Sequence, residues 1–258
     1  MNEPDIAKIE EEIRGPGYAV VDGLLTVEEI AALRSALLEV IDEDYEAWKD
    51  APGKGKYYVP ELVTYGSKMV SLLKNSKMLA IFRRLLGEDC ILYSYSTAVM
   101  PAGEEIGASK IHVDDHFFIP NWYNRIVLTL ALDEFTEANG ATLHLPGSQS
   151  MAEKPSEEEF HAGAVRLTRP AGSGVFFDPR NWHAGGANTT DRIRCGLAVV
   201  ACRKFVKPRF QYHEIAKKSL PEAELDSGLR RFLGFESWPP ASVQDFYYSA
   251  RNPSLARG

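Results

Sequence analysis

Residues 174–202 read GVFFDPRNWHAGGANTTDRIRCGLAVVAC and contain the pattern that decides the fold. Two short apolar runs, 174–178 and 194–202, are separated by a segment rich in glycine and asparagine. Short strands divided by turn residues in this way predict a sandwich or barrel rather than a doubly wound parallel sheet. Runs of the same β-rich kind occur earlier in the chain, at 91–100, 110–119, 125–132 and 142–145.

The chain that precedes these runs is predicted to be mostly helical, with one short strand at 17–23. Thr26 and Glu29 have the spacing of a capping box, in which the two side chains satisfy free amides at the start of a helix. Apolar residues at helical spacing run through 69–86, and Gly87 follows as a helix stop.

The length of 258 residues is compatible with a single domain, and no shift in composition marks a boundary. The segment 149–164 is expected to be a long polar insert, and one helix is expected around 221–233. We therefore expect one domain with three parts: a helical part at about 1–89, a β-rich core at about 90–205, and a helical or irregular tail at about 206–258.

Composition and charge exclude several classes of protein. The net charge is -7, so the chain lacks the basic excess typical of proteins that bind nucleic acid. No apolar run approaches the length of a membrane span, and the acidic amino terminus does not resemble a signal peptide. Three cysteines are too few for a disulfide framework. We expect a cytoplasmic protein that is a monomer or a homodimer.

The segment KIHVD at 110–114 contains two candidate metal ligands. In a strand, His112 and Asp114 would leave the same face, because side chains alternate with a period of two. His183 follows the predicted buried strand 174–178. Two imidazoles and one carboxylate on one face of an octahedron leave three positions open, which suits iron(II) together with a bidentate 2-oxo acid and O₂.

The His-x-Asp pair does not identify a metal site by itself. Six histidines and 36 acidic residues predict roughly one His-x-Asp or His-x-Glu pair by chance. Considered alone, such a pair is more often structural or exposed at the surface than bound to a metal.

An arginine at the start of a buried strand gives the second observation. Arg194 precedes the apolar run 195–200, and a buried guanidinium is costly unless an anion pairs with it. The distal carboxylate of 2-oxoglutarate would be such a partner, because a guanidinium binds a carboxylate in a bidentate geometry. An internal salt bridge is the alternative. Arg192 would face the same way in a regular strand, so the spacing does not separate the two arginines.

Four motifs in one order extend these observations. The chain resembles the phytanoyl-CoA dioxygenase family of iron(II)/2-oxoglutarate oxygenases. The resemblance covers roughly residues 90–202, where the matching pieces are HVD at 112–114, LTLALD at 128–133, EANGATLHLPGSQ at 137–149, and HAGGAN at 183–188 followed by Arg194.

The resemblance implies a mainly β fold with flanking helices, namely a double-stranded β-helix (jelly roll, cupin-like) whose N-terminal helices pack on one sheet. It implies iron ligands at His112, Asp114 and His183, with Arg194 holding the carboxylate of 2-oxoglutarate. Thr129 lies where the family often places a second contact to 2-oxoglutarate. Because Asp114 is present, the halogenase variant of this chemistry is not expected.

Lys110 shares the face of His112 if the strand is regular, so it either reaches the co-substrate or lies solvated at the strand end. The loops at 51–60, 101–109 and 149–164 are expected to border the site, because binding residues concentrate on loops held by a rigid scaffold.

The function that we expect is hydroxylation of a C–H bond in a small-molecule metabolite, such as a specialised natural product, with Fe(II), 2-oxoglutarate and O₂. Cyclisation, epimerisation and desaturation begin in the same way, and the sequence does not separate them. Two alternatives belong to other classes: a zinc hydrolase, because the same ligands suit zinc, and a jelly-roll binding protein without catalysis.

Overall fold

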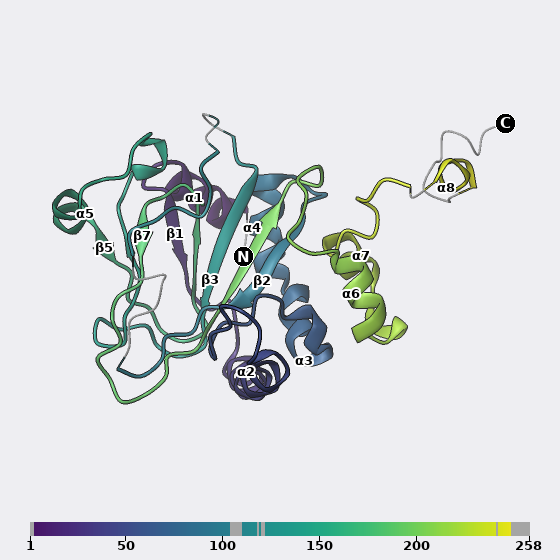
Figure 1. Cartoon of the computed structure of the whole chain (residues 1–258). Helices are drawn as coiled ribbons and strands as arrows, with labels where there is room; N and C mark the ends of the chain where they lie inside the picture. The colour runs from purple at the N-terminus through teal and green to yellow at the C-terminus, as the bar shows by residue number, and fades with distance from the viewer. Residues whose placement is uncertain (1–2, 104–109, 118, 120–121, 241, 249–258) are drawn as a thin grey trace.

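The protein is described by a computed structural model that covers residues 3–103, 110–117, 119, 122–240 and 242–248. Figure 1 shows three layers: a three-stranded sheet, a five-stranded sheet, and helices on the outer face of the larger sheet. The strands are β1 (Tyr18–Val21), β2 (Ile91–Thr97), β3 (Arg125–Ala131), β4 (Leu143–His144), β5 (Val165–Arg166), β6 (Gly174–Phe177), β7 (His183–Ala184) and β8 (Gly196–Cys202).

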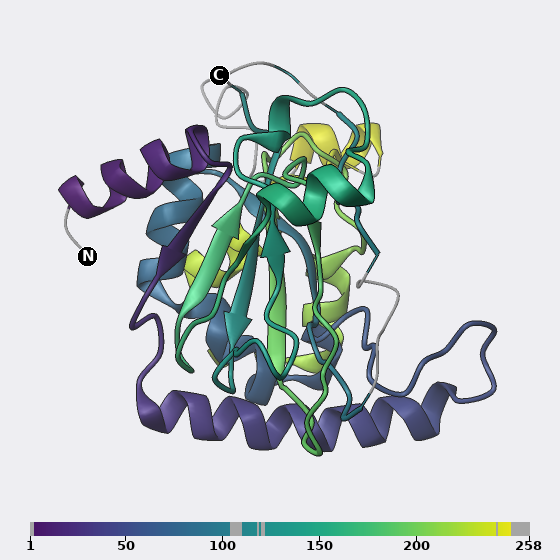
Figure 2. The ribbon, with the colours of Figure 1, turned by 90° about the vertical axis from the view of Figure 1, so that its left-hand side faces the viewer.

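The helices lie mainly at the two ends of the described chain. In Figure 2 the long helix α2 runs beneath the sheets. The α-helices are α1 (Glu3–Arg14), α2 (Val27–Trp48), α3 (Ser67–Val70), α4 (Ser76–Leu86), α5 (Glu157–Gly163), α6 (Tyr212–Ser219), α7 (Ser227–Phe232) and α8 (Val243–Tyr248). Short 3₁₀ helices are η1 (Val63–Tyr65), η2 (Ser71–Lys74), η4 (Ser148–Ser150) and η5 (Glu222–Glu224).

The larger sheet has the order β1-β6-β3-β8-β2, and all its neighbouring strands are antiparallel. The smaller sheet has the order β5-β4-β7 and is also antiparallel. Strand β3 lies at the centre of the larger sheet, where Thr129 pairs with Val175 of β6 and Ala198 of β8. The two sheets with helices on one of them agree with the jelly-roll expectation.

Alternation along β3 separates the core from the space between the sheets. Leu128 and Leu130 are fully buried in the main core with the helices, whereas Val127 and Thr129 point to the opposite face and line a cavity. The larger sheet therefore contributes one face to the core and the other face to the candidate site.

The expected capping box is confirmed: Thr26 accepts from the Glu29 amide, and the Glu29 side chain accepts from the Thr26 amide at 2.8 Å. The apolar run 69–86 is not one helix. Asn75 accepts from the Met78 amide and begins α4 as a new element, so the run divides into α3, η2 and α4.

Three further expectations are corrected. The run 110–119 is not a regular strand, since its described residues form only isolated bridges. The polar insert 149–164 contains α5, which begins at a second capping box formed by Ser156 and Glu159. The single tail helix around 221–233 is replaced by η5 and α7, because the Asp226 side chain starts a new helix.

Within the part of the chain that the structure describes, no helix is long and apolar enough to span a membrane.

Candidate metal centre

The backbone brings two distant histidines together. His112 and His183 form an isolated antiparallel bridge, in which each amide donates to the other carbonyl at 3.0 Å. Asp114 is fixed separately, because its amide donates to the Pro179 carbonyl at 2.7 Å. The segment that carries His112 and Asp114 is thus held against the chain that leads into β7.

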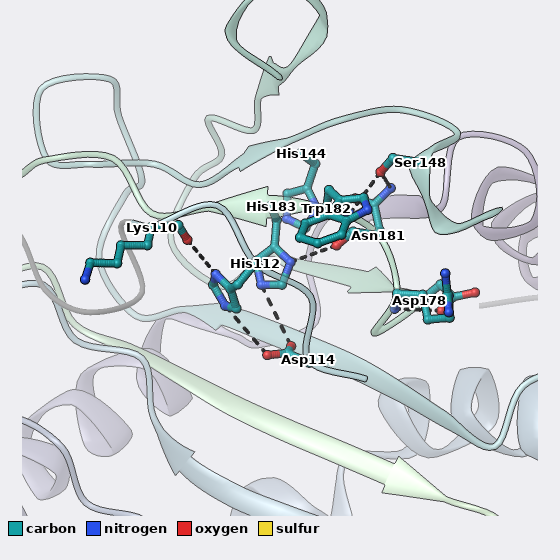
Figure 3. Close-up of polar contacts among 10 residues, drawn as sticks. Lys110, His112, Asp114, His144, Ser148, Asp178, Asn181, Trp182 and His183 are labelled. Carbon is teal, nitrogen blue, oxygen red and sulfur yellow. Dashed lines mark hydrogen bonds and ion pairs between the residues drawn. The ribbon is translucent and has the colours of Figure 1, made fainter. Parts of the chain in front are cut away.

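The three side chains converge on one point, as Figure 3 shows. His112 Nε2 lies 3.7 Å from Asp114 Oδ1, and His183 Nε2 lies 3.8 Å from Asp114 Oδ2. The ligand atoms that the three residues offer all lie within 4.8 Å of one another. This spacing, with two nitrogen donors and one oxygen donor, fits a single divalent ion such as iron(II) or zinc.

Hydrogen bonds determine which ring nitrogen of each histidine is available. His112 Nδ1 lies 2.7 Å from the Lys110 carbonyl, and His183 Nδ1 lies 2.9 Å from the Asn181 carbonyl. A carbonyl oxygen only accepts, so each Nδ1 must carry the proton. In the neutral rings both Nε2 atoms therefore present a lone pair toward Asp114, as metal coordination requires.

Burial differs across the three side chains. His183 is buried, and this burial lowers the pKa of its imidazole, which favours the neutral, ligating form. The side chains of His112 and Asp114 remain 34% and 40% exposed. The cluster therefore has one closed side, at His183, and one side that small molecules can reach.

A buried polar network supports the closed side. The ring of His144 stacks on that of His183, with centroids 5.2 Å apart and planes inclined by 12°. His144 Nδ1 lies 2.9 Å from Asn181 Oδ1, and the Asn181 amide donates to the Leu145 carbonyl at 2.9 Å and to Ser148 Oγ at 3.2 Å. His144 is thus held as a buried structural neighbour of His183.

The group formed by His112, Asp114 and His183 borders a cavity of about 910 Å³ between the two sheets. Arg194 and Thr129 line it together with the three candidate ligands. Part of the loop 51–60 borders the cavity through Gly53 and Gly55 to Tyr58, and Pro101 does so from the second expected loop. Residues 104–109 lie outside the described residues, and no residue of 149–164 lines the cavity.

The structure separates the two candidate arginines. Arg194 is buried, lines the cavity, and donates from Nη1 to the Gly140 carbonyl. Arg192 is exposed and does not line the cavity. Lys110 is also exposed; its carbonyl holds His112, while its side chain extends away from the triad in Figure 3.

Sequence reasoning missed two buried residues of this region, Asn181 and Arg169. Asn181 is fully buried beside His183, the ligand most distant in sequence from the other two. Arg169 is 4% exposed and donates to Thr129 Oγ1 at 3.1 Å. Asn181 lies two residues before His183, so its proximity was a usable signal. Arg169 lies 40 residues from Thr129, and no local pattern connects them.

The comparisons with known proteins identify the family. Residues 13–196 match the phytanoyl-CoA dioxygenase (PhyH) family, so the chain belongs to that family. A relative from Aspergillus fumigatus, dioxygenase af480, is 31% identical over 210 residues, which cover 78% of this chain and 65% of that protein. The chain is thus an oxidoreductase of the dioxygenase class.

Solved structures show the same fold at low sequence identity. The non-haem α-ketoglutarate-dependent carbocyclase SnoK from nogalamycin biosynthesis is 21% identical with a TM-score of 0.64, and the match covers 81% of this chain and 87% of SnoK. The epimerase SnoN, in complex with Fe³⁺, α-ketoglutarate and nogalamycin RO, is 19% identical with a TM-score of 0.60, over 81% of this chain and 88% of SnoN. The fold is the jelly roll of these oxygenases.

Proposed function

We propose that this protein is an iron(II)- and 2-oxoglutarate-dependent dioxygenase that hydroxylates a C–H bond of a small organic molecule and releases succinate and CO₂. The observation that carries the proposal is one cavity that contains both a two-histidine, one-carboxylate cluster and a buried arginine without a carboxylate partner among the described residues.

His112, Asp114 and His183 would hold the iron, and Arg194 with Thr129 would hold the distal carboxylate of 2-oxoglutarate. Bound together, iron and 2-oxoglutarate would supply the activation of O₂ and the oxidation of the C–H bond. The protein contributes position and the exclusion of water: the bonds from the two Nδ1 atoms fix the imidazole rings, and the buried side at His183 keeps solvent away.

The substrate would occupy the outer part of the cavity, on the exposed side of His112 and Asp114. A volume of about 910 Å³ lies within the range of small-molecule sites and leaves room for an organic substrate beside 2-oxoglutarate. Lys56 is paired with Asp42 and Arg125 with Asp115. The cavity as a whole is lined by three tyrosines and three cationic side chains, so an aromatic or acidic metabolite would suit it: Tyr57, Tyr58, Tyr93, Lys56, Arg125 and Arg209.

Hydroxylation is the default outcome, and cyclisation, epimerisation or desaturation would use the same site. The carbocyclase and the epimerase among the structural neighbours support this range, and their origin in natural product biosynthesis supports a specialised metabolite as substrate. We further expect the protein to be cytoplasmic and to act as a monomer or a homodimer.

The test is anaerobic and needs no substrate. Fe(II) and 2-oxoglutarate are added to metal-free protein, and the visible charge-transfer absorption of the chelate is recorded for wild type, Arg194→Ala and the exposed control Arg192→Ala. We expect the absorption in wild type and in Arg192→Ala, but only at much higher 2-oxoglutarate in Arg194→Ala. When O₂ is then admitted, the wild-type protein should release succinate slowly.

Absence of the absorption, with zinc retained and an ester or amide cleaved, would support a zinc hydrolase instead. Absence of both activities would support a jelly-roll binding protein.

A further inference from the structure

Two buried arginines share one aromatic ring beside the cavity. The guanidinium carbons of Arg169 and Arg194 lie 4.1 and 3.9 Å from the centroid of the Phe135 ring. All three side chains are at least 95% buried. Cation–π contacts offset part of the cost of burying these charges, but two like charges so close to one ring also repel.

Neither arginine has a carboxylate partner among the described residues. The Nε atoms of both are buried without a hydrogen-bond acceptor. Asp133, which acts on Arg194 through its charge, is bonded to Arg34 at 2.6 Å and to the Cys195 amide at 2.7 Å. Burial and the charge of Arg194 lower the pKa of Arg169 to about 9, and burial lowers the pKa of Arg194 to about 10, so both groups still carry a charge at neutral pH.

Thr129 connects Arg169 to the cavity. Arg169 does not line the cavity, whereas Thr129 does. Arg169 Nη2 donates to Thr129 Oγ1 at 3.1 Å, and its Nη1 donates to the Leu167 carbonyl at 3.1 Å. A hydroxyl that accepts from a cation keeps its own proton to donate elsewhere, and Thr129 Oγ1 donates to no described residue.

We propose that Arg169 is a positioning residue of the 2-oxoglutarate site, which turns the Thr129 hydroxyl into a hydrogen-bond donor toward the distal carboxylate. This inference rests on the proposed function. Arg194 would bind the carboxylate directly, while Arg169 would act through Thr129 and add a second positive charge behind it. The site would therefore select 2-oxo acids that carry a second carboxylate at the far end.

The experiment measures binding rather than turnover. Anaerobic calorimetry on Fe(II)-loaded protein gives the dissociation constants of 2-oxoglutarate and of 2-oxobutyrate, which lacks the distal carboxylate. Arg169→Met should weaken the binding of 2-oxoglutarate about 10-fold or more, because it removes the charge-assisted hydrogen bond that orients the Thr129 hydroxyl. Binding of 2-oxobutyrate should not change, because it has no group at the Thr129 end.

Four further variants test the connection through Thr129. Thr129→Val should weaken the binding of 2-oxoglutarate about 5- to 10-fold, whereas Thr129→Ser should bind it as tightly as wild type. Arg169→Lys keeps the charge and a donor, so it should recover part of the affinity and remains informative if Arg169→Met does not fold. In the Thr129→Val background the effect of Arg169→Met should be clearly smaller than in wild type.

Arg166→Met is the matched control, because Arg166 is a neighbouring arginine that donates to the Ala141 carbonyl and does not contact Thr129. It should leave both dissociation constants unchanged. Two results would overturn the role of Arg169 and leave the proposed function intact. One is an equal loss of affinity for both oxo acids in Arg169→Met, and the other is additive effects of Arg169→Met and Thr129→Val on the affinity for 2-oxoglutarate. Failure of wild type to bind 2-oxoglutarate would instead refute the proposed function.

Discussion

Asn181→Ala should loosen the metal centre although Asn181 offers no ligand. The Asn181 side chain is fully buried, and its Oδ1 lies 2.9 Å from His144 Nδ1. Its side-chain amide group donates to the Leu145 carbonyl and to Ser148 Oγ. Its backbone carbonyl accepts from His183 Nδ1. The side chain therefore fixes the carbonyl that orients the distal histidine.

The magnitude follows from the bonds that are lost. Truncation to alanine leaves His144 Nδ1 buried without a partner, which costs about 1–3 kcal/mol. It also removes the two hydrogen bonds that the side-chain amide donates to Leu145 and Ser148, which contribute about 1 kcal/mol each. The free energy of unfolding of the metal-free protein should fall by about 3–5 kcal/mol. Loss of a partner that orients a ligand typically weakens metal binding by about 10- to 100-fold, and we expect that range for Fe(II) here.

The assay combines urea unfolding of the metal-free proteins with anaerobic Fe(II) titration against a chromophoric chelator. Asn188→Ala is the control, because Asn188 is equally buried and bonds the Arg192 and Met100 carbonyls and Thr190, away from the triad. It should lose similar stability and retain its affinity for Fe(II). Equal Fe(II) affinity in both variants would refute the reasoning that Asn181 orients the ligand.

Three other perturbations test separate parts of the site. Asp114→Asn should abolish Fe(II)-dependent succinate release, while urea unfolding of the metal-free protein changes by less than about 0.5 kcal/mol because the side chain is partly exposed; retained release would exclude Asp114 as a ligand. Gly140→Ala should destabilise the protein by at least about 2 kcal/mol, because Gly140 has a φ of 80° and an added Cβ would collide with the Gly186 carbonyl. It should also weaken the binding of 2-oxoglutarate, because the Gly140 carbonyl accepts from Arg194. Urea unfolding would measure the first effect and calorimetry the second. Burial raises the pKa of Asp178 from 3.8 to about 6, so its carboxylate costs stability above pH 6 and that cost fades as the pH falls toward 4. Asp178→Asn should therefore be more stable than wild type by up to about 3 kcal/mol at pH 8, with a smaller difference at pH 4.5, and an advantage independent of pH would contradict this account.

The sequence by itself determined the local features. The capping box at Thr26 and Glu29 and the strands β2, β3, β6 and β8 follow from patterns a few residues long, in which backbone geometry alternates side chains between faces. The spacing of His112 and Asp114 also brought these two side chains near one another, although the segment is not the regular strand that the pattern predicted.

Only the tertiary structure decided how distant segments meet. His112 contacts His183 through a backbone bridge, and Arg169 reaches Thr129, because the register of the sheets and the path of the loops bring them together. Arg194 and Arg192 share one sequence period, yet only Arg194 is buried and faces the cavity. A periodic pattern reports the face of a local element, whereas contacts across the fold depend on the packing of the whole chain, which no short pattern contains.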